Sequence, residues 1–458
     1  MSASVKSLRE EFRELMKLAI PIAIAQGGQS LMGLVDTLVV GRAGTSALAA
    51  VGLANSLFFA VAGMGMGLMM GFDPLLSQAF GAKNGTRARA LLWQGGWMAL
   101  FAGSVLAAVA LVIPEVLPFF GYAREELAET RAYLYWRAPS LVTMFAFLML
   151  RSYLQSSAST RPLVVATVAA NIFNLGADIL LVFGGTVLPE GFGPLRLIPA
   201  MGAAGAALAT FLCTVIQLGI VLYAVRRLVP SEEKPVRRPV WPDLRQAARV
   251  GIPIGLHIGA EIGVFALAGV LAFKLGQASM GAHQIALSFA SVSFTMAVGI
   301  GNAGSVRVGW AVGAQNTPQA RLSGFVAFVG GGGFMALSAL VFALFPGTLS
   351  QLAGAAVDVV PLLIPLLMVT AIFQVFDGLQ GVGAGVLRGA GETRFTFLAN
   401  MVGHYAIGLP LSLLLGFGLK LGILGIWWGL CAGLIAVALA LLWRFHRLSA
   451  GTLRPLEA

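Results

Sequence analysis

Four carboxylates stand inside stretches of the sequence that are otherwise almost entirely apolar. They are Asp36, Asp178, Glu261 and Asp377. A charge at the centre of a membrane helix costs about 2.5–3.5 kcal/mol on insertion scales, so such residues are rare and usually face a cavity or a bundle interior. A carboxylate that faces a cavity can bind a proton or a metal cation, or hold a cationic ligand. The alternative is a buried hydrogen-bond network with a structural role only.

The companions of these carboxylates favour the cavity. Residues three, four or seven positions apart share one face of a helix, and on each face the carboxylate is accompanied by polar or small residues. The four faces carry Gln26, Gln29, Gly33 and Asp36; Asn171, Asn174 and Asp178; His257 and Glu261; and Gln374, Asp377, Gly381 and Ala384. A charge that faced lipid would not bring such companions on its own face.

Other polar features of the apolar stretches carry weaker signals. His404 fits a packing residue, and Asp73 fits a helix-end or loop contact. The glycine-rich stretch 63–71 lacks the flanking strand that a phosphate-binding loop needs, and its spacing fits close helix packing. The sequence shows no metal-ligand cluster and no nucleophile elbow, so we expect neither an enzyme nor a cofactor.

The composition places these residues in a membrane protein. The chain has 458 residues, of which 58% are hydrophobic and 11% charged, whereas soluble domains carry about 25% charged residues. The formal net charge is +11, but the basic residues lie in short loops between apolar runs. That placement is a topology signal, and it argues against nucleic acid as a partner. Cys213 and Cys431 lie inside apolar runs, so no disulfide framework is expected.

The apolar runs predict an all-α polytopic membrane protein with twelve transmembrane helices. The spans centre near residues 28, 60, 102, 140, 173, 213, 260, 292, 332, 370, 405 and 433. A polar, proline-bearing linker at 226–244 separates an N-lobe, 1–225, from a C-lobe, 245–458. Alternating loops place 23 of the 30 Lys and Arg residues on the side that holds both termini. By the positive-inside rule that side is cytoplasmic, and the acidic loop 115–129 falls outside.

An internal repeat relates the two predicted lobes. A shift of 232 residues aligns Ile20-Pro21 with Ile252-Pro253 and the turn Gly81–Asn84 with Gly313–Asn316. Six spans in each half is an even number, so the repeat is parallel, and we expect a pseudo-two-fold axis along the membrane normal. None of the four carboxylates obeys the repeat: Asp36, for example, aligns with Ala268. We therefore expect a symmetric scaffold whose lobes have unequal roles.

The sequence resembles the multidrug and toxic compound extrusion (MATE) family over nearly its whole length. The resemblance rests on GLVDTLVVGRAG (33–44), LSQAFGAKN (76–84), GAHQIALSFASVSF (281–294) and FQVFDGLQGVGAGVLRGAGETR (373–394). It is closest to the NorM-like branch, because AEIGVF surrounds Glu261 and the tenth span carries Asp377.

The resemblance implies a two-lobed antiporter that exports cationic or amphiphilic drugs against inward Na⁺ or H⁺. It implies ion-coupling roles for Asp36, Asn174 and Asp178 in the N-lobe and for Glu261 and Asp377 in the C-lobe, with Na⁺ held by either set. Thr210 matches a threonine of the sixth span less securely, because the loop 184–201 before it is long. The residues expected to line the substrate cavity are Gln29, Thr210, His257, Gln284 and Gln374.

The resemblance also implies a setting and leaves one rival. The setting is a bacterial inner membrane, with the lipid bilayer as partner and the protein as a monomer. The rival is a flippase for lipid-linked precursors. Its pyrophosphate-bearing substrate would need a cationic cavity, whereas the charges near the middle of the spans are acidic here. Neither the residues nor the resemblance selects Na⁺ over H⁺, or one lobe over the other as the ion site.

Overall fold

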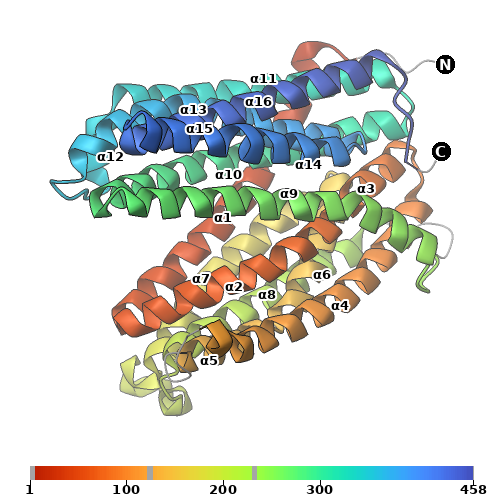
Figure 1. The fold of residues 1–458 in the computed structure, drawn as a ribbon. Coiled ribbons are helices and arrows are strands. Elements are labelled where there is room, and N and C mark those ends of the chain that lie inside the picture. Colours follow the sequence, from red (N-terminus) through yellow and green to blue (C-terminus); the bar gives the residue numbers. More distant parts are fainter. Residues whose placement is uncertain (1–5, 121–126, 229–234, 457–458) are drawn as a thin grey trace. The chain divides into compact units, whose positions relative to one another are not determined.

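A computed structural model describes residues 6–120, 127–228 and 235–456, and these form helices joined by turns and short loops (Figure 1). Parts of the predicted acidic loop and linker, residues 121–126 and 229–234, lie outside the described residues. The all-α prediction is confirmed for the described part of the chain.

Eleven helical segments of the described chain are long and apolar enough to cross a membrane. They are α1 (Leu8–Ala43), α2 (Thr45–Met70) with α3 (Phe72–Gly81), α4 (Gly85–Val116), α7 (Arg161–Phe183), α8 (Gly202–Arg227), α9 (Trp241–Lys274), α10 (Gln277–Gly313), α11 (Thr317–Leu344), α13 (Val360–Gly389), the run α14 (Arg394–Met401), η4 (Val402–Gly408), α15 (Leu409–Leu413) and η5 (Leu414–Gly418), and α16 (Gly422–Ala450). The remaining short helices are η1 (Leu117–Phe120), α5 (Ala128–Arg137), α6 (Ser140–Ser156), η2 (Gly185–Val187), η3 (Glu190–Leu197) and α12 (Pro346–Leu352).

The predicted span near residue 140 is divided between two of the short helices. α5 ends at Arg137, and α6 begins at Ser140. Pro139 lacks an N–H group and cannot continue the ladder of helical hydrogen bonds. Arg137 is buried at the break, where its guanidinium lies 4.5 Å from the Phe58 ring centroid. Neither helix reaches membrane-spanning length alone, which explains eleven long segments where the sequence predicts twelve.

The chain forms two compact units whose boundaries differ from a cut at the linker. The C-unit contains residues 6–24, 73–84 and 256–456. The N-unit contains residues 25–72, 85–120, 127–228 and 235–255. Relative to the predicted lobes, residues 6–24 and 73–84 belong to the C-unit, and residues 245–255 belong to the N-unit. The three exchanged segments are therefore 6–24, 73–84 and the start of α9, 241–255, whose first four residues lie in the predicted linker. Helices α1 and α9 each pass from one unit to the other shortly after a proline, at Pro21 and Pro253.

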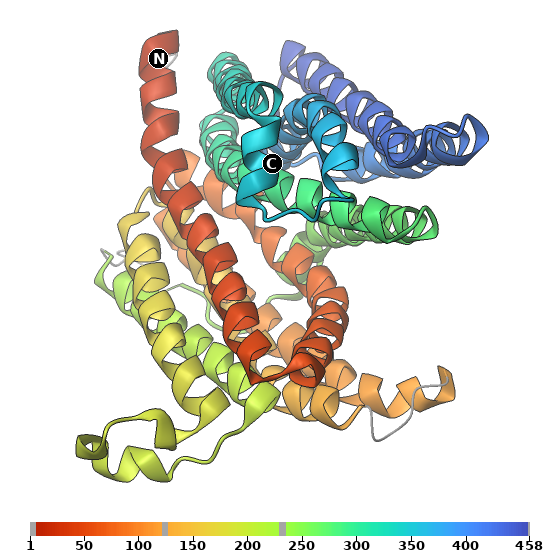
Figure 2. The same ribbon diagram turned by 90° about the vertical axis from the view of Figure 1, so that its left-hand side faces the viewer.

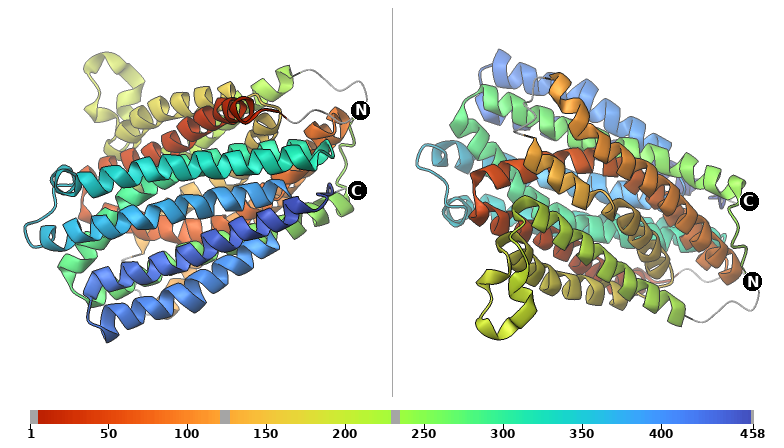
Figure 3. Two further views of the ribbon diagram at one scale, coloured as in Figure 1. Left: turned by 90° about the horizontal axis from the view of Figure 1, so that it is seen from above. Right: turned by 90° about the horizontal axis from the view of Figure 1, so that it is seen from below.

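In the C-unit, α13 packs against α10, α11 and α16, and these helices run side by side (Figure 3). The N-terminal turns of α1 join this core through Leu15, Leu18 and Ile22. In the N-unit, α8 packs against α5, α6 and α7. The segment that holds η2 and η3 extends away from the helices of the N-unit (Figure 2).

The internal repeat is visible in the backbone. Lys83 and Gln315, which the 232-residue shift aligns, both adopt left-handed conformations with φ of 58° and 55°. The glycines before α2 and α10, Gly44 and Gly276, also have positive φ. Matching turns at matching positions support the parallel repeat that the sequence predicts.

The exchanged helix ends are held by backbone contacts that only glycine permits. A Cβ added at Gly67 of α2 would fall onto the backbone of Gly255 in α9, within the N-unit. In the C-unit, a Cβ at Gly299 of α10 would meet the backbone of Ala23 in α1. These two pairs are related by the repeat, since 67 and 23 become 299 and 255 after a shift of 232 residues.

These contacts predict that Gly67→Ala destabilises the protein, whereas Gly52→Ala does not. Overpacking a tight contact typically costs about 1–3 kcal/mol. Gly52 lies in the same helix with open space around it, so alanine there is expected to gain helix propensity. Thermal unfolding in detergent, followed by loss of the monodisperse peak, checks the pair of variants. Equal melting temperatures for both would contradict the packing argument.

Candidate functional site

The N-unit gathers four of the predicted residues around one point. Asp36 comes from α1, Asn174 and Asp178 come from α7, and Thr210 comes from α8. The Asp178 carboxyl adjoins both the Asp36 carboxyl and the Asn174 amide. The Thr210 hydroxyl lies 3.0 Å from Asp36 Oδ2, to which it can donate, and 2.9 Å from the Ala206 carbonyl oxygen.

The oxygens of this cluster are buried and incompletely satisfied. Asn174 and Asp178 have no exposed surface. Both carboxylate oxygens of Asp178, Oδ1 of Asp36 and both amide atoms of Asn174 have no hydrogen-bond partner among the described residues. No ion pair within the described chain joins either carboxyl to an Arg or Lys. Two adjacent buried carboxylates repel one another unless a proton or a cation lies between them.

The composition of the cluster suits a hard cation or a proton. Its side chains offer carboxylate, amide and hydroxyl oxygens, which are the ligand types that hard cations prefer. α7 is tied to α1 beside the cluster, where Asn171 Nδ2 donates to the Gly28 carbonyl oxygen over 3.0 Å. Gln29, predicted to line the substrate cavity, is half-buried nearly two turns before Asp36 on α1.

The C-unit brings the other two carboxylates together between α9 and α13. Asp377 adjoins Glu261 and is 5% exposed. His257 Nε2 lies 3.7 Å from Glu261 Oε2. Gln380 was not predicted as a site residue, yet its Nε2 lies 3.2 Å from His257 Nε2, and its side chain adjoins Glu261. Its position three residues after Asp377 places it on the same helical face, which is the signal that could have identified it.

The helices of this second cluster also carry aromatic residues. Phe265 stands one turn after Glu261 on α9, and its ring lies 6.1 Å from that of Phe373 on α13. The Phe373 ring in turn lies 5.0 Å from that of Trp427. Aromatic faces attract organic cations and stack on flat ligands. The C-unit cluster therefore differs in chemistry from the all-oxygen cluster of the N-unit.

Two further predicted residues of the C-unit have different environments. Gln374 is fully buried, and its Oε1 accepts from Ser293 Oγ at 2.7 Å and from Ser338 Oγ at 3.0 Å. These bonds fix it one turn before Asp377, where it can position that residue's helix. Gln284 is exposed and lines an apolar pocket of about 510 Å³ between α9 and α10, to which Phe265 also contributes.

The eleventh span carries a polar pair that the sequence assigns no site role. His404 and Asn400 are buried and stand one turn apart, and their polar side-chain atoms have no hydrogen-bond partner among the described residues. His404 lies within electrostatic range of His257. The surrounding helix is widened to π geometry in η4 and η5, on both sides of α15. α15 contains Pro410, which cannot donate a helical hydrogen bond.

Both clusters are mixed in residue type, and neither fits a transition-metal centre. The described residues include no group of three or more His, Cys, Asp or Glu side chains arranged to hold a metal ion. The first cluster supplies two carboxylates and neutral oxygens, and the second supplies two carboxylates with a histidine and a glutamine. This chemistry fits exchangeable cations better than a tightly bound one.

A family model described as MatE matches residues 21–180 and 253–414. These two ranges contain every residue of both clusters except Thr210, and they cover more than half of the chain. The chain belongs to the MATE family. The two matched ranges also follow the repeat that the sequence and the backbone show.

Curated relatives place this MATE protein in the NorM-like branch. It is 31% identical to "Probable multidrug resistance protein NorM" of Rhizobium meliloti (strain 1021), over 98% of this chain and 96% of that protein. It is 32% identical to "Multidrug resistance protein NorM" of Burkholderia vietnamiensis, over 97% of this chain and 96% of that protein.

Solved structures share the MATE fold at lower identity. One is titled "Outward-facing conformation of a multidrug resistance MATE family transporter of the MOP superfamily", with a TM-score of 0.85 and 19% identity over 98% of this chain and 99% of that one. Another is a eukaryotic MATE transporter, AtDTX14, with a TM-score of 0.82 and 21% identity over 97% of this chain and 98% of that one. Together with the helices described above, they confirm the two-lobed, all-helical fold class.

The N-unit geometry predicts a specific dependence on the Thr210 hydroxyl. Thr210→Val keeps the shape but removes the donor to Asp36, so we expect ion-driven dye efflux from proteoliposomes to fall severalfold. Thr210→Ser keeps the donor and should retain most of the activity. Full activity in Thr210→Val together with loss of activity in Thr210→Ser, with both proteins folded, would show that the side-chain methyl matters and the hydroxyl does not.

Proposed function

We propose that this MATE protein is a secondary active multidrug exporter of a bacterial inner membrane, driven by antiport with Na⁺ or H⁺. The observation that carries the proposal is the acidic interior of both units, where buried Asp178 and Asp377 and partly buried Asp36 and Glu261 stand without an arginine or lysine partner in the described chain. The names of the NorM relatives support the substrate class. The eleven segments of the described chain that are long and apolar enough to cross a membrane support transport across the bilayer.

The proposed coupling follows from linkage. A ligand shifts a conformational equilibrium only by its differential affinity for the two states. A cation or proton that enters from outside binds more tightly to one conformational state, and a cationic drug binds more tightly to the other. Ion binding and drug release then favour the same state, and the coupling is reciprocal. Movement of the two units about their shared helices would carry the sites from one side of the membrane to the other.

The two clusters suggest a division of labour. We assign ion coupling to the N-unit, because Asp36, Asn174, Asp178 and Thr210 present only oxygen ligands. We assign cargo binding mainly to the C-unit, because the helices that carry Glu261 and Asp377 also carry Phe265 and Phe373, whose rings meet edge to face. A negative site lined by aromatic rings suits cationic and amphiphilic compounds.

The flippase alternative would need a cavity lined by cationic side chains that are free to bind pyrophosphate. The buried arginines of the described chain do not supply one. Arg307 is paired with Glu11, Arg388 with Asp73 and Asn302, and Arg137 lies over the Phe58 ring. The charge balance of the site therefore favours cationic cargo over a pyrophosphate.

A gradient experiment tests the coupling. Purified protein in liposomes is loaded with a cationic dye, and efflux is followed under an inward Na⁺ gradient and then under an inward H⁺ gradient. We expect one gradient to drive efflux, with collapse of that gradient by an ionophore stopping it. Efflux that ignores both gradients would reject antiport. Flipping of a labelled lipid-linked pyrophosphate without dye efflux would support the alternative.

Neutral substitutions test the division of labour. We expect Asp36→Asn to abolish ion-driven efflux and ion binding while dye binding persists. Glu261→Gln with Asp377→Asn should weaken dye binding more than ion binding. Calorimetric titration with the coupling ion and fluorescence titration with the dye read the two properties separately. Asp358→Asn, at an exposed position, is the matched control. Equal loss of ion binding on neutralising either cluster would refute unequal roles.

A further inference from the structure

The three exchanged segments share one feature that the proposed function does not use. In each segment, one acidic residue is paired with an arginine from the other half of the sequence. The pairs are Glu11 with Arg307, Asp73 with Arg388, and Asp243 with Arg87. Other ion pairs of the described chain, such as Arg444 with Glu392, join residues of the same half.

Glu11 has the most complete environment of the three acids. It has no exposed surface, and Arg307 is 7% exposed. Oε1 accepts from Arg307 Nε at 2.8 Å and from Ser323 Oγ at 2.7 Å. Oε2 accepts from a second Arg307 nitrogen and from Gln319 Nε2. A bidentate, fully hydrogen-bonded pair of this kind holds its partners in one geometry.

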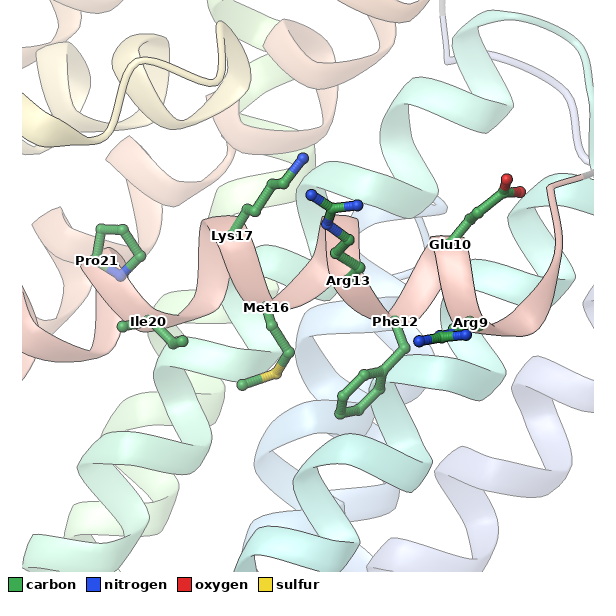
Figure 4. Close-up of a pocket in the computed structure, with 8 residues that line it drawn as sticks. All are labelled: Arg9, Glu10, Phe12, Arg13, Met16, Lys17, Ile20 and Pro21. Atoms are coloured by element: carbon green, nitrogen blue, oxygen red, sulfur yellow. The ribbon is translucent and has the colours of Figure 1, made fainter.

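The opposite face of the same α1 segment is exposed. Figure 4 shows Arg13 and Lys17 projecting from one side of the helix and Arg9 from another side, and all three line a groove of about 830 Å³. Phe12 lies there too, and with Val329 of α11 it lines a smaller groove of about 240 Å³. The basic residues of this segment are thus exposed, whereas Glu11 is buried against α10 and α11.

Asp243 occupies the repeat-equivalent position to Glu11, since the two differ by 232 residues. Its two carboxylate oxygens accept from Arg87 NH1 at 2.7 Å and from Arg87 NH2 at 2.8 Å. Arg87 in turn is repeat-equivalent to Gln319, which also binds Glu11. The start of α1 and the start of α9 are therefore each held by a carboxylate at the equivalent position, once in each unit.

The third pair holds α3 on the C-unit. Arg388 Nε lies 3.3 Å from Asp73 Oδ2, and Arg388 NH2 donates to Asn302 Oδ1 over 2.6 Å. Farther along α3, Gln78 Nε2 donates to the Gly389 carbonyl oxygen over 3.1 Å. Ser77, which is 1% exposed, packs against Gly309 of α10. Asp73 follows directly on the break between α2 and α3 at Gly71.

We propose that Arg87, Arg307 and Arg388 are positioning residues for transport, and that the segments they hold must be released when the protein changes state. Each segment is covalently continuous with one unit and packed in the other. A change in the relation of the units therefore either bends α1 and α9 or detaches the segments. The ion pairs stabilise the attached state. The proposal rests on the exporter function, because it names what moves during that cycle.

A reversible link tests whether release is needed. In a protein with Cys213 and Cys431 replaced by alanine, Phe12→Cys and Val329→Cys place two thiols on opposite walls of the 240 Å³ groove. A short bifunctional methanethiosulfonate reagent joins α1 to α11 there without touching the ion pairs. We expect dye turnover to be lost on linking and to return on reduction, while dye affinity is unchanged. Unaltered turnover in the linked protein would overturn the proposal.

Charge neutralisation tests the arginines themselves. The readout is the rate at which maleimide labels position 77 in a Ser77→Cys protein. We expect two double variants to raise this rate severalfold: Arg307→Gln with Glu11→Gln, and separately Arg388→Gln with Asp73→Asn. Turnover should fall while dye affinity holds. For the third pair, whose arginine is partly exposed, Arg87→Asp with Asp243→Arg should restore the turnover that Arg87→Asp alone removes.

Matched controls separate this role from general destabilisation. Arg13→Gln removes a charge from the exposed face of α1, and Arg444→Gln with Glu392→Gln removes an ion pair within one half. Neither should change labelling at position 77. Equal labelling in every variant, or a rise in the controls as large as in the tested pairs, would refute the positioning role. Failure of the exporter function would appear earlier, as absent dye efflux in the unlinked, cysteine-free protein.

Discussion

The cost of placing charge in a low-dielectric interior organises this molecule. A buried ion is tolerated only when it is paired, fully hydrogen-bonded or able to bind a neutralising partner. The described chain uses two of these solutions in separate places. Glu11 and Asp243 are satisfied by arginine and neutral donors, so they serve structure. Asp178 and Asp377 retain unpartnered oxygens, so they are suited to a ligand that comes and goes.

The sequence predicts the helices, the repeat and the residues of both clusters, because each of these depends on local periodicity. Apolar runs specify spans, and an i, i+3, i+4 pattern specifies a face. It does not predict which helices exchange ends, because Glu11 and Arg307 are almost three hundred residues apart and nothing in their spacing relates them. Gln380 was missed for a similar reason: its partner His257 lies on another helix. Pro139 indicates a break within the span near residue 140, whereas hydropathy alone predicts one continuous helix there.

The repeat and the sites obey different rules. The glycine contacts at 67 and 299, the left-handed turns at 83 and 315, and the acids at 11 and 243 all follow the 232-residue shift. These features determine how helices pack and end, so both halves need them. The buried carboxylates do not follow the shift, and their surroundings differ as much as their positions do. Oxygen ligands surround one cluster, whereas aromatic rings lie beside the other.

The paired acids show how far the symmetry constrains the chemistry. Glu11 and Asp243 occupy equivalent positions in the two halves, but their arginine partners come from different helices. Asp243 pairs with Arg87 of α4 in the N-unit, whereas Glu11 pairs with Arg307 of α10 in the C-unit. At the position equivalent to Arg87, Gln319 still binds the acid as a neutral donor. The first helix of each half, α1 or α9, is therefore held by a carboxylate whose hydrogen bonds are satisfied. The helix that supplies the positively charged arginine differs between the halves. Glu11 is fully buried, whereas Asp243 is 9% exposed. Separating Glu11 from Arg307 therefore costs more free energy than separating Asp243 from Arg87, because fewer water molecules can replace the lost hydrogen bonds.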